Sequence, residues 1–351
     1  MGRRGLSPAA PPGPGTTAAA MLRFILQRAI GMVVTMFFVS IMVFVIMELP
    51  PGDYADRYAF RKFSGTGVVV TEEDIESIRK QFGLDRPAWE RYLTWIWGIV
   101  TRFDFGPSFA FETSVTDVIG ERVGLTLVLL VATLLLTYLL SIPIGIYAAV
   151  RRQSLADYGL TVVSYLGLAI PNFMLALILL YIGVTYFDTT VGGLFSPEFE
   201  KAPWSWAKFR DLLAHLFVPA VVLAWSATAL QLQTVRATMS DELHKPYVDA
   251  ARARGLGEAK VILKYPARLA INPVVSTIGF DINRIFSELP IVALVLGLPE
   301  LGELLLRSFL DLDMYVAGAI LLMLTFVIVF MNFVSDIVLA LLDPRIRLEG
   351  G

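Results

Sequence analysis

Long apolar stretches with few or no charges recur along this chain and dominate its hydropathy pattern. Five of them contain between 19 and 30 consecutive uncharged residues, and a membrane-spanning helix needs about 20. A sixth stretch around residues 269–298 is interrupted by three charged residues, but neither part alone is long enough to cross a bilayer. We therefore predict six spans, at about residues 24–48, 123–150, 158–187, 212–235, 270–297 and 314–342.

These spans are predicted to be helices. Only a helix satisfies its own backbone hydrogen bonds in lipid, and the strands of a barrel would alternate apolar with polar residues. The composition agrees, because 56% of the 351 residues are hydrophobic and 17% are charged, whereas a soluble domain has about 25% charged residues. It excludes a disordered protein and a nucleic-acid binder with a basic face, and the absence of cysteine excludes a disulfide scaffold. The predicted class is an all-α integral membrane protein.

Basic residues are concentrated on one side of the predicted spans. Residues 1–28, 151–157, 236–268 and 343–351, together with Asp336, contain 15 Lys and Arg against 8 Asp and Glu. Cytoplasmic segments carry such an excess, so both termini and the 236–268 loop are predicted to be cytoplasmic and residues 50–122 external. Residues 1–20 form a Pro/Ala/Gly tract without the apolar core of a signal peptide, and we predict a disordered tail.

The external region 50–122 contains two predicted helices. Thr71 precedes three acidic residues and is a suitable N-cap for the first. Pro87 suits the first turn of the second, which carries Trp89, Tyr92, Trp95 and Trp97. These aromatics either hold a helix at the membrane surface, as Trp and Tyr commonly do, or line a docking site or substrate vestibule.

The cytoplasmic segment 236–268 contains a short run of small and basic residues. Ala250, Ala251 and Ala253 would let another protein approach the backbone closely, and Gly255 would end the helix in a left-handed conformation. On the residues alone, the favoured interpretation is an ordinary basic cytoplasmic loop that follows the positive-inside rule. The candidate coupling residues are Tyr247, Asp249, Ala250, Ala251, Arg252, Arg254, Gly255 and Leu256.

The fifth span contains four polar residues, Asp281, Asn283, Arg284 and Glu288. Arg284 falls near the middle of the bilayer, where a charge must face water or a partner. Asp281 and Glu288 lie three and four residues away, so both carboxylates can reach Arg284 on one helix face. The group is either a structural ion-pair stripe or part of a polar translocation path.

Several short motifs occur in an order and spacing that resemble one known family. They are Pro51-Gly52-Asp53, Gln81-Phe82-Gly83-Leu84-Asp85-Arg86-Pro87, Phe105-Gly106-x-Ser108, Arg151-Arg152-x-Ser154-x-x-Asp157, Ile170-Pro171-x-Phe173, Tyr247-Val248-x-Ala250-Ala251-Arg252-Ala253-Arg254-Gly255-Leu256 and Leu341-Leu342-Asp343-Pro344-Arg345. Over residues 21–347 the chain is similar to permease subunits of the dipeptide/oligopeptide/nickel family of binding-protein-dependent ABC importers.

The resemblance implies a fold, partners and a location. The fold would be the type I ABC importer permease, in a bacterial or archaeal cytoplasmic (inner) membrane. The 236–268 loop would form a coupling helix in a groove of one of two cytoplasmic ATPase subunits, which would bind ATP and Mg. This chain would bind no cofactor or metal, and it contains no Gly-x-x-x-x-Gly-Lys-Ser/Thr loop. A second permease, commonly a paralogue, would complete the pore, and an extracellular solute-binding protein would deliver the ligand.

The chain also departs from the family pattern at two points. Asp249 stands where the general importer motif has Glu, and Ala293 aligns with a Glu that peptide-type members carry before the turn at Pro299-Glu300-Leu301-Gly302. The expected function is peptide import, with oligosaccharide or nickel import by the same machinery as alternatives.

Two other classes fit some of the residues. A secondary transporter is compatible with six spans and buried charges, but it would often show an inverted repeat, which the sequence does not display. An intramembrane hydrolase needs paired catalytic groups at one depth, and no Gly-x-Gly-Asp motif frames Asp281 or Asp336.

Overall fold

The computed structural model describes residues 14–49, 59, 71–81, 83–187, 192–200 and 202–342. The motif residues Pro51-Gly52-Asp53, Phe82 and Asp343-Pro344-Arg345, and residues 1–13 of the tail predicted for residues 1–20, lie outside this part of the chain. The described residues are mainly helical: α1 (Pro14–Glu48), α3 (Glu72–Gln81), α4 (Ala88–Arg102), α5 (Val115–Val150), α6 (Leu155–Ala169), α7 (Asn172–Phe187), α8 (Pro197–Glu200), α9 (Trp206–Leu243), α10 (Pro246–Ala253), α11 (Glu258–Lys264), α12 (Pro266–Ala270), α13 (Asn272–Ser276), α14 (Ile278–Leu296), α15 (Leu301–Leu310) and α16 (Met314–Leu342).

Two helices begin earlier than the hydropathy pattern predicts. Residues 14–20 belong to α1 and not to a disordered tail, because Pro14 suits a first helical turn and the alanines that follow favour helix. Helix α5 begins at Val115, eight residues before the predicted span, because the Ser114 hydroxyl accepts a hydrogen bond from the Thr116 amide (3.2 Å) and caps it. Capping and propensity therefore set these boundaries.

The number of uninterrupted spans is smaller than the six predicted. Among the described residues, four helices are long and apolar enough to cross a membrane: Met21–Glu48, Val115–Val150, Trp206–Leu243 and Met314–Leu341. The predicted span 158–187 is two helices, α6 and α7, that meet at 102°, because Pro171 cannot donate to the helical ladder and restricts Ile170 to an extended conformation. Helices α14 and α15 meet at 82°, so the described residues provide up to six spans if each bent pair is one.

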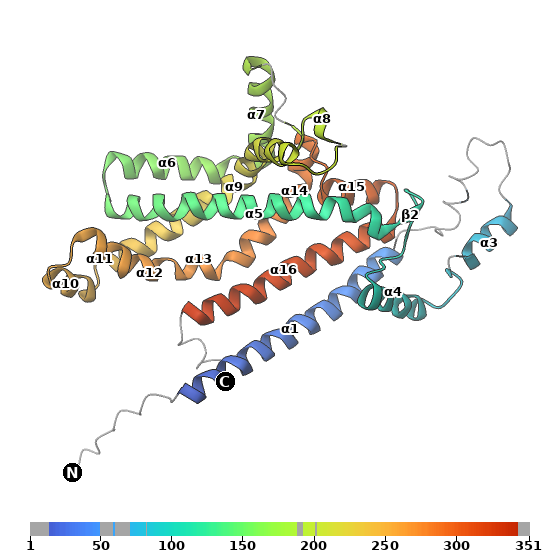
Figure 1. Cartoon of the computed structure of the whole chain (residues 1–351), viewed down its shortest axis with the longest axis horizontal. Coiled ribbons are helices and arrows are strands. Elements are labelled where there is room, and N and C mark those ends of the chain that lie inside the picture. Colours follow the sequence, from blue (N-terminus) through green and yellow to red (C-terminus); the bar gives the residue numbers. More distant parts are fainter. Residues whose placement is uncertain are drawn as a thin grey trace, which may run out of the picture.

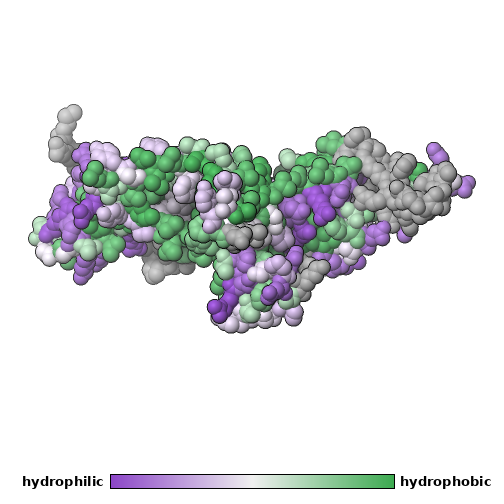
Figure 2. Space-filling model, turned by 90° about the horizontal axis from the view of Figure 1, so that it is seen from above, coloured by the Kyte–Doolittle hydropathy of each residue, from purple (hydrophilic) through white to green (hydrophobic). Residues whose placement is uncertain are grey.

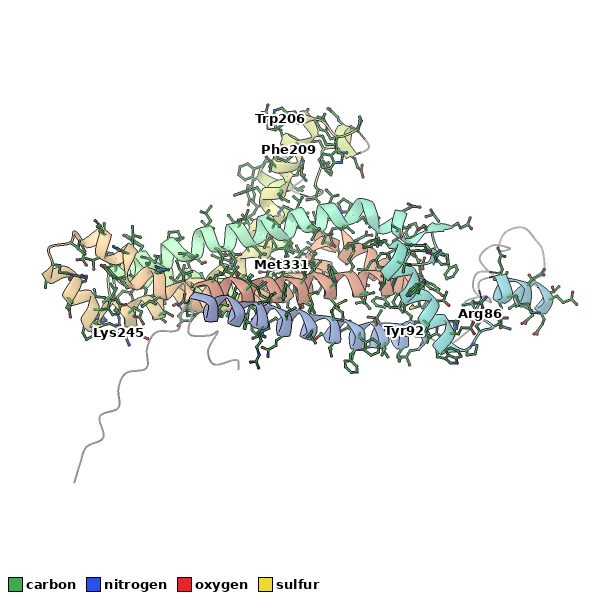
Figure 3. All side chains as sticks on the ribbon, turned by 60° about the horizontal axis from the view of Figure 1, so that its bottom comes forward. Arg86, Tyr92, Trp206, Phe209, Lys245 and Met331 are labelled. Carbon is green, nitrogen blue, oxygen red and sulfur yellow. The ribbon has the colours of Figure 1, made fainter. Side chains whose placement is uncertain are left out.

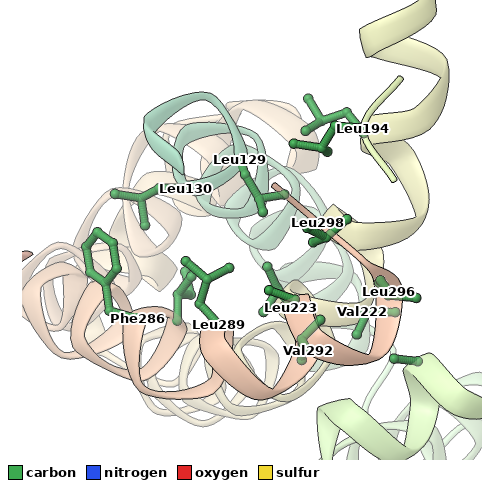
Figure 4. Packing of buried hydrophobic residues seen from close by; sticks show 14 of the residues in the cluster. Leu129, Leu130, Leu194, Val222, Leu223, Phe286, Leu289, Val292, Leu296 and Leu298 are labelled. Atoms are coloured by element: carbon green, nitrogen blue, oxygen red, sulfur yellow. The ribbon is translucent and has the colours of Figure 1, made fainter. Parts of the chain in front are cut away.

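Helix α14 lies at the centre of the largest apolar cluster. Its buried residues, among them Ile282, Phe286 and Leu289, pack against α5 and α9 (Figure 4). Helix α7 contributes Ala176 to the same cluster. Polar residues on α14 are therefore close to three other helices.

Helices α5 and α9 approach closely at Gly145. A Cβ atom built on Gly145 would lie 2.8 Å from the Val235 Cβ and 2.9 Å from the Leu232 carbonyl oxygen. Close backbone approach at small residues is typical of helix pairs in membranes, where packing rather than water exclusion drives association.

The two ends of the elongated molecule differ in character. The start of α1, the end of α16 and helices α10 and α11 lie at one end, and α4, α15 and the β-hairpin lie at the other (Figure 1). The hairpin pairs β1 (Pro107–Ser108) with β2 (Thr113–Ser114), and the buried Asp313 carboxylate holds it to the start of α16 by accepting bonds from the Ser108 hydroxyl (2.7 Å) and the Phe109 amide (3.0 Å). Hydrophobic residues cover much of the surface between the ends, and hydrophilic residues gather at the α10–α11 end (Figure 2).

Candidate coupling surface and translocation path

Helix α10 is the element that the sequence singles out as a coupling segment. It follows directly from the 38-residue helix α9 through His244 and Lys245, with Pro246 in its first turn; Lys245 is labelled at this end of the molecule (Figure 3). The chain leaves it through Gly255, whose φ of 76° is left-handed as predicted. A continuous helix therefore connects the apolar core to α10.

One face of α10 packs on α11, and this corrects part of the sequence interpretation. Val248 and Ala251 are fully buried against Val261, with Tyr247 and Leu256 at the edge of the cluster. Ala251 was expected to face a partner, but its side chain is inside the chain's own fold because α11 folds back beneath α10. The exposed small residues of α10 are Ala250 and Ala253.

Charged side chains connect α10 to α11 instead of extending freely. Arg252 donates to Glu258 (2.7 and 3.2 Å) and to Asp249 (3.3 Å). The hydrogen bond from Arg252 holds the pKa of the Glu258 carboxyl below its ordinary value. The turn at Gly255 is thus bridged by an ion pair, and α10 and α11 form one small unit.

Tyr247 and Arg254 lie at the edges of this unit. The Tyr247 hydroxyl donates to Glu242 on α9 (2.6 Å), and burial followed by this hydrogen bond raises the pKa of Tyr247. Arg254 Nη2 lies 3.5 Å from the Tyr265 hydroxyl. Tyr247 therefore fixes α10 to the end of α9, and Asp249, Ala250 and Ala253 remain as its open face.

An ion pair connects α9 to α6 near the same end of the molecule. Asp157, which is 1% exposed, accepts two bonds from Arg236, at 2.6 Å to Nε and 2.9 Å to Nη2. Arg152 donates to Ser240 on α9 (2.9 Å). Arg152 and Asp157 belong to the motif at residues 151–157, and Arg236 begins the 236–268 segment, so these contacts connect both sequence features at this end of α9.

The four polar residues predicted for the path all lie on α14, but they do not form the predicted triad. Asp281 is buried and accepts from the Tyr138 hydroxyl (2.8 Å) on α5 and from Gln231 (2.5 Å) on α9. Glu288 accepts from Asn172 on α7. Arg284 makes no ion pair within 4 Å to any residue that the structure describes, so the pairing predicted from helical spacing is wrong: neutral donors from three neighbouring helices satisfy the carboxylates.

Sequence reasoning missed those three donors. Tyr138, Gln231 and Asn172 each stand as a polar side chain within an apolar stretch, which was the available signal, since buried polar groups need partners. Asn283 is exposed and Arg284 half-buried on the α14 face that carries Phe280, Ser287 and Ile291. Of the predicted path residues, Asn283 and part of Arg284 are therefore accessible at the surface of this chain, whereas Asp281 is buried inside it.

Metal binding finds no support in the described ranges, where no group of three His, Cys, Asp or Glu side chains is placed to hold an ion. The arrangement instead provides a polar stripe on α14 and a small exposed surface on α10, which follows the long helix α9.

Comparisons with known proteins agree with this arrangement. A family described as the binding-protein-dependent transport system inner membrane component matches residues 141–348, and the N-terminal part of such membrane components matches residues 21–130. The chain is 33% identical over 332 residues to a putative peptide permease protein of Brucella ovis, covering 93% of this chain and 99% of the relative. It is 32% identical over 331 residues to the oligopeptide transport system permease protein AppB of Bacillus subtilis, with coverage of 93% and 100%.

A third relative, the peptidoglycan transport system permease protein YejB of Agrobacterium fabrum, is 33% identical over 281 residues, or 79% of this chain and 77% of the relative. The two matching family regions, together with relatives that are 32–33% identical over 93% of this chain, show that the chain belongs to the family of inner membrane components of binding-protein-dependent transport systems.

Proposed function

We propose that this chain is one half of the pore of an ATP-driven peptide importer, paired with a second permease subunit, commonly a paralogue in this family. The names of the three relatives, which refer to peptides, oligopeptides or peptidoglycan, support peptides over oligosaccharides or nickel as the cargo. A secondary transporter would not explain the family membership.

In the proposed orientation, the cytoplasm is faced by the end that carries α10, the start of α1 and the end of α16. Two ATPase subunits there bind ATP and Mg and hydrolyse the nucleotide, while this chain catalyses no reaction. The observation that carries the proposal is the open face of α10, with Asp249, Ala250 and Ala253 exposed at the end of a helix that continues unbroken to Gln231 beside Asp281. At 1.5 Å per residue the distance from Gln231 to Leu243 is about 18 Å, so movement of α10 reaches the polar stripe of α14 through a single rigid element.

The polar face of α14, with Asn283, Arg284 and part of Glu288, lines the translocation path in this proposal. A half-buried Arg284 that forms no ion pair within 4 Å with the described residues costs at least about 2.5–3.5 kcal/mol in lipid. A water-filled path removes that cost, which supports placing this face toward the pore. The second permease closes the other side.

Substitution of Ala250 by Trp tests the coupling surface. In the assembled importer, Ala250→Trp places a large side chain on the open face of α10, so we expect loss of ATPase co-purification and of peptide uptake, with normal insertion of the chain. Ala207→Trp, at an exposed alanine at the opposite end of α9, is the matched control. Wild-type uptake and ATPase recovery in Ala250→Trp would contradict the proposed docking.

The orientation has its own test because the chain contains no cysteine. Single cysteines at Ala253 and Ala207 should react with a membrane-impermeant thiol reagent only from the cytoplasmic and only from the external side, respectively. Labelling of Ala253→Cys in intact cells would reverse the proposed orientation.

A further inference from the structure

Helix α4 carries an apolar face that the described part of the chain leaves exposed. Four large side chains form this face, Trp89, Leu93, Trp97 and Val100, and they are 53 to 70% exposed. Their spacing of four, four and three residues places them on one side of the helix. We call these four residues the apolar stripe. A contiguous group of exposed large apolar side chains marks an interaction surface.

The polar residues of α4 lie on other sides of the helix. Thr94 and Thr101, both exposed, directly follow Leu93 and Val100, so each is turned by about 100° from its apolar neighbour. By the same helical spacing, Arg91 lies nearly opposite to the apolar stripe. Trp and Leu on one face, with polar and charged residues on the other, are typical of a helix that lies in the membrane interface.

Contacts on a third side of α4 hold it against the membrane helices α1 and α16. Trp95 is buried and packs in one apolar cluster with Phe44 of α1 and Leu322 of α16. The hydroxyl groups of Tyr92 and Ser40 of α1 lie 2.8 Å apart and share a hydrogen bond. The direction in which the apolar stripe points is therefore fixed relative to the spanning helices.

The contacts with α1 also give the depth of α4. The charge-free part of α1 covers residues 29–47, a length of about 28 Å, which is close to the thickness of the hydrocarbon core. Glu48 therefore lies at the boundary of that core, where Arg91 of α4 pairs with it. Ser40, the partner of Tyr92, lies about 12 Å further into the core. Helix α4 is thus placed at the boundary, where an interfacial helix buries its apolar face about 5–10 Å deep.

The course of the chain agrees with a position in the plane of the membrane surface. Helix α4, which carries Tyr92, lies across α1 and α16, whereas those two helices run along the molecule (Figure 3). The chain that follows α4 is bonded to its neighbours, because the Trp95 indole donates to the Phe105 carbonyl (3.0 Å) and the Thr116 hydroxyl donates to the Phe103 carbonyl (2.9 Å). Rotation of the apolar stripe toward water would break these bonds.

We propose that α4 is a membrane-interface helix whose apolar stripe is embedded among the phospholipid headgroups and the first acyl carbons of one leaflet. This leaflet lies at the end of the molecule opposite to α10, and it is the outer leaflet in the proposed orientation. Trp89 and Trp97 suit this layer, because an indole ring is apolar and its N–H can donate to headgroups or water. The apolar stripe contains no basic residue, so its partner is the interface itself and not an anionic headgroup.

The test uses the complete importer, assembled with cysteine-free partner subunits, in phospholipid nanodiscs. This chain contains no cysteine, so a nitroxide label can be attached to the single variants Leu93→Cys, Thr94→Cys, Val100→Cys and Thr101→Cys. Electron paramagnetic resonance then compares how often each label collides with oxygen, which concentrates in lipid, and with a water-soluble nickel chelate. The two threonine positions are matched controls, because each is one residue away from its apolar partner on the same helix. Trp95 is left intact because it holds α4 in place.

We expect the ratio of oxygen to nickel collisions to be several-fold higher at positions 93 and 100 than at positions 94 and 101. Equal ratios within both pairs would overturn the proposal, because the apolar stripe would then face water. Protection of positions 93 and 100 from both reagents would also overturn it, since a protein would then cover the apolar stripe.

A second measurement needs no label. Phospholipids that carry bromine close to the headgroup should quench part of the tryptophan fluorescence of the unmodified importer. The quenched fraction should fall in the double variant Trp89→Phe with Trp97→Phe, and an unchanged fraction would contradict the proposal. Neither measurement depends on peptide uptake, so failure of the proposed function would be a separate result.

Discussion

The close contact between α5 and α9 gives a prediction with a magnitude. Gly145→Ala would place a Cβ atom 2.8 Å from the Val235 Cβ and 2.9 Å from the Leu232 carbonyl oxygen. The oxygen belongs to the backbone of a helix, so it can move only if the helices separate. Overpacking of this kind costs about 1–3 kcal/mol, while exchange of Gly for Ala within a helix returns about 0.8–1.0 kcal/mol. We expect a net loss of up to about 2 kcal/mol in unfolding free energy.

Gly124→Ala is the matched control on the same helix. A Cβ atom on Gly124 would have no heavy atom within 4 Å, so this variant should be neutral or stabilised by up to about 1 kcal/mol. Both variants gain the same helix propensity, so it cancels in the difference between their unfolding free energies. The remaining difference is the cost of the contact, about 1–3 kcal/mol. Thermal unfolding of the purified importer, followed by tryptophan fluorescence, measures it. Equal unfolding transitions for both variants would refute the reasoning that α5 and α9 pack too closely at Gly145 to accommodate a Cβ atom.

Two other predictions concern the end of the molecule that carries α10. Asp157→Asn should lower the unfolding free energy by about 1–3 kcal/mol, less than the 3–5 kcal/mol of a fully buried pair, because the Arg236 side chain is 28% exposed; an unchanged unfolding curve would show that the pair contributes nothing. The pKa of Glu258 is lowered by Arg252, so its stabilisation of the α10–α11 unit is complete above the unfolded-state pKa and is lost as the pH falls through the lower folded-state value. Amide hydrogen exchange in α10 should therefore accelerate on acidification in wild type and show no such pH dependence in Glu258→Gln, after correction for intrinsic exchange.

The sequence alone was sufficient for the features that depend on local chemistry. Long uncharged runs predict spanning helices because lipid offers no other partner for the backbone, and α16 ends at Leu342, where the predicted sixth span ends. Gly255 was expected to be left-handed because a helix of small residues ends there, and its φ is 76°. Each of these predictions needs only neighbours along the chain.

Other features were decided by contacts between distant segments. Helical spacing allowed Asp281 and Glu288 to reach Arg284, but hydrogen bonds from Tyr138, Gln231 and Asn172 occupy the carboxylates instead. No periodicity along α14 reports which side chains three other helices bring to it.

The burial of Ala251 and the pocket beside α4 have the same origin. Ala250 and Ala251 are equivalent in size and propensity, yet only Ala251 is buried, because α11 returns beneath one face of α10. The pocket beside α4 joins residues more than 230 positions apart, from Lys80 to Tyr315. Propensity and hydropathy act over a few residues, whereas partner choice, burial and concave surfaces depend on which faces meet when the helices pack, and that is determined only by the tertiary structure.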